Sequence, residues 1–279
     1  MGSLDALPRR VWLRGDLSAL LAANKAEWKL PASMTAGRFL SYLLEKSLLR
    51  EVELVSERYG SLTRYVWRNA SQYEVFSSIK PRSYLVQATA IFLHNLTDLD
   101  PKIIYVNSEQ TPKPPANRDT ISQATINRAF ANKQRESQLI YKHSSQSCVV
   151  ISGKNTGDLG VVEFRDANDI PLRLTDLERT LIDAVVRPSY AGGFANVAEA
   201  YARAAGRLST NRIIAYLKKL NHAYPYHQII GFLMTRTGHP RNSIAMVRDL
   251  GISHDFFADY GMKNPDFDSD WRVFFPKGL

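Results

Sequence analysis

The chain has 279 residues, of which 44% are hydrophobic and 23% charged, an ordinary composition for a folded protein with one large domain or two smaller ones. A single cysteine, Cys148, excludes an internal disulfide framework and a thiolate metal cluster. Apolar runs are only a few residues long, and the first residues lack the order of a secretion signal. We therefore expect a soluble, cytoplasmic protein with no membrane partner.

The formal net charge is +9, and the basic excess is unevenly distributed along the chain. Residues 1–82 hold 13 basic and 8 acidic side chains, and residues 101–154 hold 8 basic and 3 acidic ones. Residues 155–190 reverse this balance, with 4 basic against 7 acidic side chains. The basic surplus favours a polyanionic partner such as nucleic acid.

The first part of the chain predicts a helix, a turn, a second helix and a two-stranded ribbon. The signal is helical spacing or strand alternation in four segments, residues 17–24, 34–48, 51–57 and 62–68. Asp16 and Ser33 can cap the two helices, and Gly60 can form the turn of the ribbon. This order is typical of a winged helix-turn-helix, which we predict for residues 5–78.

A winged helix places its second helix in the major groove of DNA, with the first residues of that helix nearest the base edges. The candidate groove residues are Thr35, Arg38, Ser41, Tyr42 and Lys46. The candidate phosphate contacts are Arg9, Arg10, Arg14, Arg64 and Arg68. The alternative is a solvated helix pair followed by a hairpin, because the second helix carries no strong basic cluster.

Residues 79–279 predict a larger, mixed α/β domain, so the expected fold class is α+β. A small sheet is expected from four strands, residues 102–107, 147–152, 160–165 and 170–174, and a last strand from residues 270–275. Helices are expected at residues 84–96, 177–186, 196–205, 210–220 and 226–236. Within the polar stretch 111–145, residues 111–116 predict an exposed loop, and residues 121–135 a poorly packed helix or a mobile excursion.

The sharpest local signal lies at residues 174–183. Thr175 and Glu178 fit a capping box, and Arg179 and Asp183 are one helical turn apart and can pair. We interpret this segment as a well-started helix that leaves a strand. The alternatives are a partner surface and a charged active site, although no nucleophile or metal ligand is evident nearby.

Other patterns do not indicate chemistry. The six histidines lack the spacing of a zinc site, and the segment 153–157, although rich in glycine, lies between two predicted strands and is interpreted as a hairpin turn. We therefore expect no catalytic residue, no metal and no cofactor.

Several segments resemble the AbiEi family in the order expected for it. They are RLTDLERTLIDA at residues 173–184, RPSYAGGF at 187–194, YHQIIGF at 226–232, WRVFFP at 271–276, and a winged helix that precedes YLVQATAIFLHNL at 84–96. The members of this family are the antitoxins of AbiE abortive-infection systems, usually classed as type IV toxin–antitoxin systems.

The resemblance implies a transcriptional repressor of viral defence that is not an enzyme. Its first domain would bind inverted repeats of double-stranded DNA in its own promoter. Its second domain, with the motif Glu178, Arg179, Thr180 and Asp183, would counteract a nucleotidyltransferase toxin without a stable complex being required. Two alternatives stay open: a metal-dependent nuclease that uses acids of residues 158–183, and a regulator that senses a ligand and has no toxin partner.

Overall fold

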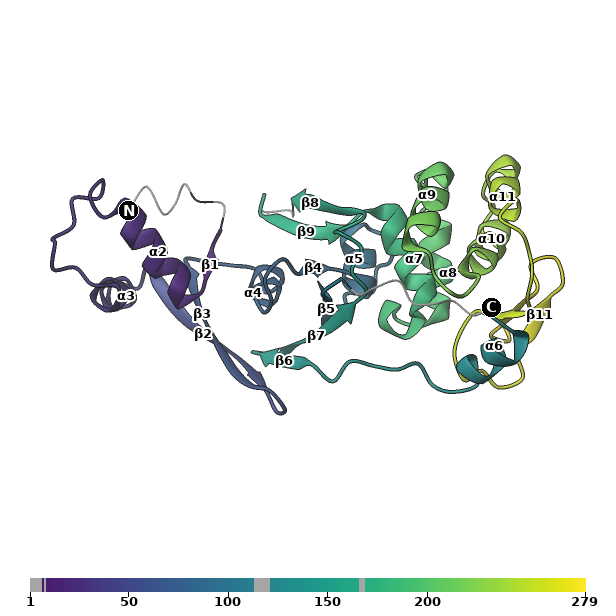
Figure 1. The fold of residues 1–279 in the computed structure, drawn as a ribbon, viewed down its shortest axis with the longest axis horizontal. Helices are drawn as coiled ribbons and strands as arrows, with labels where there is room; N and C mark the ends of the chain where they lie inside the picture. The colour runs from purple at the N-terminus through teal and green to yellow at the C-terminus, as the bar shows by residue number, and fades with distance from the viewer. Residues whose placement is uncertain (1–6, 8, 113–120, 166–168) are drawn as a thin grey trace.

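The computed structural model describes residues 7, 9–112, 121–165 and 169–279. We call the described residues up to 78 the N-terminal region and the remainder the C-terminal region. The elements of the N-terminal region are β1 (Val11–Trp12), α2 (Arg14–Asn24), α3 (Ala36–Glu45), β2 (Leu49–Ser56), β3 (Gly60–Trp67) and α4 (Gln72–Ser77). The molecule is elongated, with α2 and α3 at one end (Figure 1).

The helix and ribbon order predicted for the N-terminal region is observed, with different helix starts. Thr35, rather than Ser33, caps α3, and its hydroxyl accepts a hydrogen bond from the Arg38 amide at 3.3 Å. In α2, Asp16 lies inside the first turn and accepts a bond from the Leu13 amide at 3.1 Å. A side chain therefore caps the first amides of α3, whereas in α2 the Asp16 carboxylate binds the amide of the residue that precedes the helix.

The β2–β3 hairpin has two buried faces, which connect it to different parts of the molecule. On one face, Leu49 and Trp67 pack with the α2 and α3 side chains in a core of their own. On the other face, Leu54 and Val66 join a core that continues into the C-terminal region through residues such as Val106. The alternation of side chains along a strand produces this division.

The C-terminal region contains the remaining elements in chain order. They are β4 (Tyr84–Leu85), α5 (Gln87–Leu93), β5 (Ile103–Glu109), α6 (Gln123–Phe130), β6 (Ile140–His143), β7 (Gln146–Gly153), β8 (Val161–Arg165), β9 (Pro171–Thr175), α7 (Leu177–Val186), the 3-10 helix η1 (Pro188–Ala191), α8 (Phe194–Arg203), α9 (Thr210–Leu220), α10 (Tyr226–Arg236), α11 (Arg241–Arg248), β10 (Phe256–Phe257), β11 (Asp266–Asp268) and β12 (Val273–Phe275). The fold class is therefore mixed α+β, as predicted.

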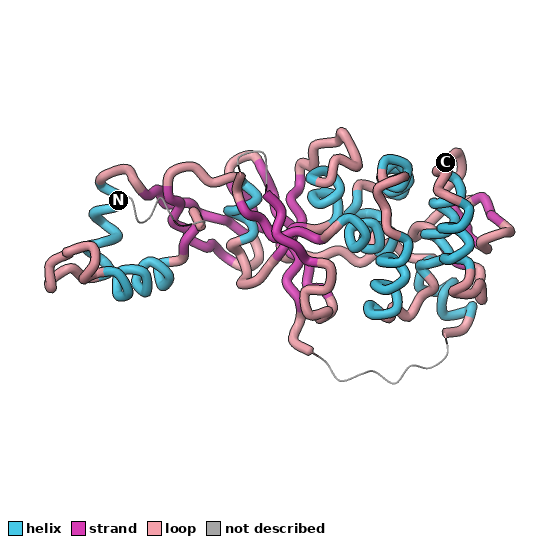
Figure 2. The backbone as a smooth tube through the Cα atoms, turned by 90° about the horizontal axis from the view of Figure 1, so that it is seen from above, coloured by secondary structure: helices cyan, strands magenta, loops and turns pink. Residues whose placement is uncertain are grey.

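The small sheet expected for the C-terminal region is part of a larger one. Nine strands form a sheet in the order β1-β3-β2-β6-β7-β5-β4-β9-β8, which runs through the middle of the molecule (Figure 2). The strands of the two regions meet where β2 pairs with β6 at Val55 and Lys142. The two predicted domains thus share a sheet and a core, which sequence periodicity alone did not indicate.

Two local predictions in the C-terminal region are wrong. The segment expected as one helix at residues 84–96 is divided into β4 and α5, because Tyr84 and Leu85 pair with β5 before the helix begins. The loop after Gly153 is not a hairpin turn, because β7 lies beside β5 and β6 whereas β8 pairs with β9.

The polar stretch 111–145 is better packed than expected. Its helix α6 lies beside the C-terminal strands at the far end of the molecule (Figure 1), and the Gln123 side chain exchanges hydrogen bonds with the Asp255 backbone. Phe130 is buried and stacks on Tyr260 with 4.4 Å between ring centroids. The exposed loop predicted at residues 111–116 lies largely outside the described residues.

The helices α7 to α11 form a bundle at the opposite end from α3 (Figure 1). The helix α10 is buried along most of its length, and a Cβ at Gly231 would lie 2.1 Å from the Trp271 ring. Glycine is therefore required for this close packing. Among the described residues, no helix is both long and apolar enough to cross a membrane.

Candidate nucleic-acid interface and the buried charged motif

The polar side of α3 is the first candidate surface. Phe39, Leu40 and Leu43 anchor the helix, and its opposite side faces solvent. All five predicted groove residues are exposed there: Thr35, Arg38, Ser41, Tyr42 and Lys46. The helix therefore presents a continuous polar row at the N-terminal end of the molecule.

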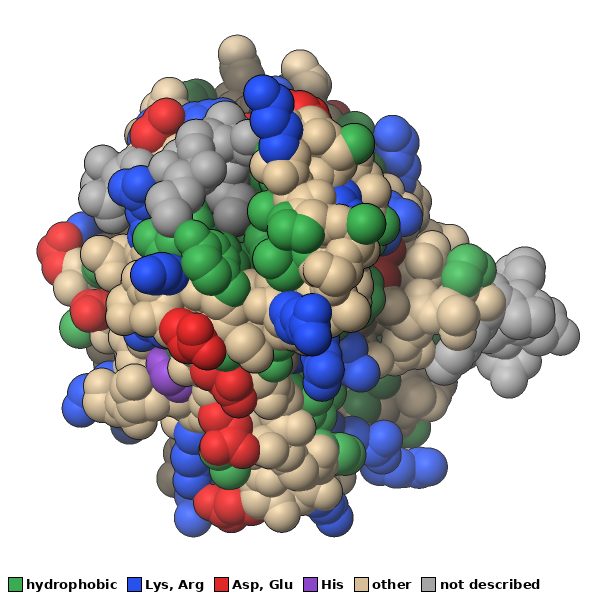
Figure 3. Space-filling model, turned by 90° about the vertical axis from the view of Figure 1, so that its left-hand side faces the viewer, with side chains coloured by type: hydrophobic (Ala, Val, Ile, Leu, Met, Phe, Trp, Pro, Cys, Tyr) green, Lys and Arg blue, Asp and Glu red, His purple; other side chains and the backbone are tan. Residues whose placement is uncertain are grey.

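The hairpin beside α3 carries acidic as well as basic groups. Glu51 is paired with Tyr65 and so shares the helix-facing side of the hairpin, where Glu53 also lies exposed. Figure 3 shows a row of acidic side chains on this end of the molecule, with Lys and Arg on both sides. Arg58 and Tyr59 are exposed at the hairpin turn. These two residues are candidate contacts that sequence reasoning missed, although a residue at the tip of a ribbon could have been chosen by its position.

The prediction that Arg64 contacts phosphate is wrong, because its side chain is buried. Arg64 is only 5% exposed and lies between the hairpin and the end of α4. Its guanidinium donates to the Ser78 carbonyl at 2.9 and 3.2 Å, and to the Ser78 hydroxyl at 2.9 Å. Burial lowers the pKa of Arg64. The carbonyl groups at the end of α4 stabilise the buried guanidinium by accepting its hydrogen bonds. Arg64 therefore joins the hairpin to α4.

The other predicted phosphate contacts lie at or near the surface. Arg14 and Arg68 are exposed. Arg10 is half-buried and donates to the Asn69 carbonyl at 3.0 Å, whereas Arg9 pairs with Asp16 and lies over the Trp12 ring at 5.0 Å. Arg9 is therefore exposed but already paired with a carboxylate, and Arg10 is the least exposed of these four residues.

The motif at residues 174–183 lies inside the C-terminal region. The predicted pair is present: Arg179 Nε donates to Asp183 Oδ1 at 2.9 Å, and the Arg179 side chain is 7% exposed. The predicted capping box is wrong, because Asp176 caps α7 by accepting a bond from the Arg179 amide. Thr175 instead bonds the Thr180 hydroxyl at 2.8 Å.

Glu178 is also engaged inside the protein. Its carboxylate is 3% exposed, accepts a bond from the Ser209 amide at 2.9 Å, and pairs with Arg212 Nη1 at 3.0 Å. It therefore fixes the start of α9 against α7. The four motif residues are a structural network, with Asp183 the least enclosed of them, and their burial leaves little surface for a partner.

The loop after β7 is held by an internal carboxylate. Glu109, at the end of β5, accepts bonds from the amides of Thr156 and Gly157 at 2.9 and 3.1 Å and from the Thr156 hydroxyl. Burial raises the pKa of Glu109, but these donors together hold it below its ordinary value. The backbone amides that could attract a phosphate are therefore occupied by the protein itself.

The acids of residues 158–183 were the proposed magnesium ligands of the nuclease alternative. Asp158 pairs with Arg82 and Arg173, at 2.5 and 2.8 Å, and Asp183 pairs with Arg179. Over the part of the chain that the structure describes, no group of three or more His, Cys, Asp or Glu side chains is arranged to hold a metal ion.

Comparison with known proteins gives a fold relationship. No family model matches the chain, and no curated protein matches it. The fold is similar to the crystal structure of the Rv2827c protein from Mycobacterium tuberculosis, with a TM-score of 0.58 and 13% sequence identity. The alignment covers 98% of this chain and 89% of the other. At this identity the similarity shows a shared fold and carries no functional assignment.

Proposed function

We propose that the chain is a DNA-binding antitoxin of the AbiEi kind, which represses its own operon and counteracts a nucleotidyltransferase toxin in abortive infection. Residues 5–78 act as a winged helix-turn-helix, and the C-terminal region acts on the toxin. The exposed polar row on α3 carries the DNA-binding part of this proposal.

Three features support α3 as the groove-binding helix. Its apolar side is fully used in packing, so the polar row is not needed for the fold. The row lies at one end of an elongated molecule, where a duplex can approach without meeting the C-terminal helices (Figure 1). The exposed Arg14 and Arg68 lie in the same region and are suited to phosphate contacts.

The acidic row on the hairpin restricts how DNA is bound. Side chains such as Glu51 and Glu53 repel phosphates, so the duplex contacts α3 rather than the flat side of the ribbon. Base-specific contacts from α3 then matter more than a general basic surface. We therefore expect specific binding well above the binding to unrelated DNA.

The decisive experiment measures binding of the full chain to its own upstream DNA against a scrambled duplex of equal length, at several salt concentrations. Specific binding with a steep salt dependence supports the proposal. Arg38→Glu should weaken specific binding by about 10- to 100-fold or more, as expected for loss and reversal of a groove contact. The matched control is Arg241→Glu, since Arg241 is exposed on α11 at the other end of the molecule. Equal weak binding to both duplexes, or unchanged binding by Arg38→Glu, contradicts the assignment.

The antitoxin part needs a separate test, because DNA binding and toxin control can fail independently. The chain is co-expressed with a nucleotidyltransferase encoded beside it, and growth is followed after induction. Rescue of growth by both the wild-type chain and Arg38→Glu places the activity in the C-terminal region. Absence of rescue by the wild-type chain contradicts the antitoxin part and leaves a regulator that does not counteract this toxin.

A further inference from the structure

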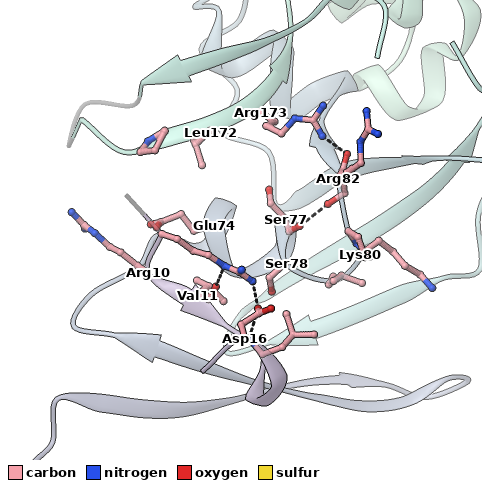
Figure 4. Close-up of a pocket in the computed structure, with 16 residues that line it drawn as sticks. Arg10, Val11, Asp16, Glu74, Ser77, Ser78, Lys80, Arg82, Leu172 and Arg173 are labelled. Atoms are coloured by element: carbon pink, nitrogen blue, oxygen red, sulfur yellow. Dashed lines mark hydrogen bonds and ion pairs between the residues drawn. The ribbon is translucent and has the colours of Figure 1, made fainter. Parts of the chain in front are cut away.

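A pocket of about 620 Å³ lies where the two regions meet. Its walls come from the chain around β1 and the start of α2, from the end of α4 and the segment that follows, and from β9 (Figure 4). The pocket is distinct from the polar row of α3, although Arg9 and Arg10, two of the predicted phosphate contacts, are among its lining residues. Its volume is within the range of small-molecule sites.

The polar lining is mostly cationic. Five basic side chains line the pocket, Arg9, Arg10, Lys80, Arg82 and Arg173, against the two carboxylates of Asp16 and Glu74. Both carboxylates are engaged within the protein: Asp16 binds Arg9 and the Leu13 amide, and Glu74 accepts the Ser71 amide at 2.8 Å.

The cations at the C-terminal wall are incompletely neutralised. Arg82 and Arg173 share one carboxylate, that of Asp158. Their side chains stay 80% and 38% exposed, and Arg173 also donates to the Arg82 carbonyl, so the two guanidinium groups lie close together. Guanidinium groups bind phosphate oxygens through paired hydrogen bonds, which makes a phosphate the anion of best fit.

Two further features point to an organic phosphate. The Ser77 hydroxyl is buried and has no hydrogen-bond partner in the structure as described, although Ser77 is among the lining residues. The other lining side chains include an apolar set that suits a base or another flat group: Val11, Leu13, Ile79, Pro81 and Leu172. The sugar-phosphate backbone of a DNA duplex does not require an apolar lining of this kind.

We propose that this pocket binds a small phosphorylated ligand of the nucleotide class. The phosphates lie beside Arg82 and Arg173, whose guanidinium groups lie together at the C-terminal wall (Figure 4), and the nucleoside lies against the apolar walls. Because residues of both regions line the site, the bound ligand holds the N-terminal region to the C-terminal region. The proposal does not depend on the DNA-binding or antitoxin assignment.

The test is calorimetric titration of the full chain at low salt with ATP and with inorganic pyrophosphate, both without divalent metal. Saturable binding of one ATP per chain is expected, with pyrophosphate at least tenfold weaker because it lacks the nucleoside. Equal affinities for the two probes contradict the nucleoside part, and no saturable binding of either probe at about 1 mM overturns the site.

Variants then locate the binding. The double substitution Arg82→Ala and Arg173→Ala should weaken ATP binding at least tenfold, and Ser77→Leu, which fills part of the pocket, should do the same. The control pair is Arg241→Ala and Lys263→Ala, two exposed cations remote from the pocket. Thermal unfolding checks that each variant is folded. Equal losses in the test and control pairs indicate a general basic surface and overturn the proposal.

A short duplex in competition distinguishes nucleotide from nucleic acid. The proposal expects that a 12-base-pair duplex of unrelated sequence leaves ATP binding unchanged at about 150 mM salt. Displacement of ATP, with parallel loss of duplex binding in the Arg82 and Arg173 variant, reassigns the pocket to the DNA backbone and contradicts a small-ligand site.

Discussion

The predicted functional residues on α3 and those of the α7 motif have opposite environments. In the N-terminal region, the residues of α3 chosen as groove contacts, such as Arg38 and Tyr42, are exposed and make few internal contacts. In the C-terminal region, the motif residues Glu178, Arg179 and Thr180 are buried and satisfied within the protein. A local polar pattern is therefore informative about function only when the fold leaves it at the surface.

We therefore expect substitutions at the two sites to have different effects, on stability at one and on DNA binding at the other. Changes in the α7 motif should alter the free energy of unfolding, whereas changes on α3 should alter DNA affinity and leave unfolding within about 0.5 kcal/mol of the wild type.

The largest effect is expected at the buried ion pair of α7. Arg179→Met should lower the free energy of unfolding by about 3 kcal/mol, because it leaves the largely enclosed Asp183 carboxylate without its partner. Chemical denaturation measures this loss. Adding Asp183→Leu should recover part of it, since the unpaired charge is then removed as well. If Arg179→Met alone is as stable as the wild type, the ion pair does not stabilise the fold.

A second, smaller loss is expected at the joint between the hairpin and α4. Arg64→Met should lower the free energy of unfolding by about 2–3 kcal/mol, since the carbonyl of Ser78 loses a charged donor in a buried position. Folded protein of this variant should bind the operator with unchanged salt dependence. A shallower salt slope would restore Arg64 as a phosphate contact, against its observed burial.

The loop held by Glu109 gives a pH-dependent prediction. The pKa of this carboxyl is held below its ordinary value of 4.5, so its contribution to stability is complete above about pH 4.5 and is lost as the pH falls through the folded-state pKa. Glu109→Gln should cost about 1 kcal/mol at pH 7, because the group is partly exposed and solvent weakens its bonds. Below pH 4 the two proteins should approach each other in stability. A constant difference across this range would contradict the role of the charge.

The extent to which the sequence predicted the molecule depended on how local the controlling interactions are. The helices at residues 177–186, 210–220 and 226–236 were predicted with their observed bounds, since apolar spacing within each segment determines them. The pairing of β2 with β6, by contrast, brings Val55 beside Lys142, and no sequence pattern near either residue indicates that pairing. The capping error at α7 has the same origin, since Tyr216 donates to the Asp176 carboxylate at 2.6 Å from a helix 40 residues further along the chain.

The candidate site was predictable in the same partial way. Helical periodicity identified the exposed side of α3, because an amphipathic helix buries one side and exposes the other. Arg64 was misassigned because alternation places it on the face of β3 that α4 covers. The pocket at the joint was not predictable at all, because its cations come from segments as far apart as Arg9 and Arg173.

The smallest effect concerns the acidic side of the hairpin. Replacing Glu51 and Glu53 together by Gln removes two negative charges from the helix-facing side of β2, where both are exposed. If DNA approaches α3, these charges repel phosphates at a distance comparable to the screening length, so binding to any duplex should tighten only a few-fold at low salt and hardly at physiological salt. Fluorescence anisotropy with the operator and the scrambled duplex measures both affinities. The same replacement at Asp266 and Asp268, on β11 at the other end of the molecule, should change neither affinity. A large gain confined to the operator would instead place this side of the hairpin in direct contact with bases. That result would contradict the assignment of base recognition to the exposed residues of α3.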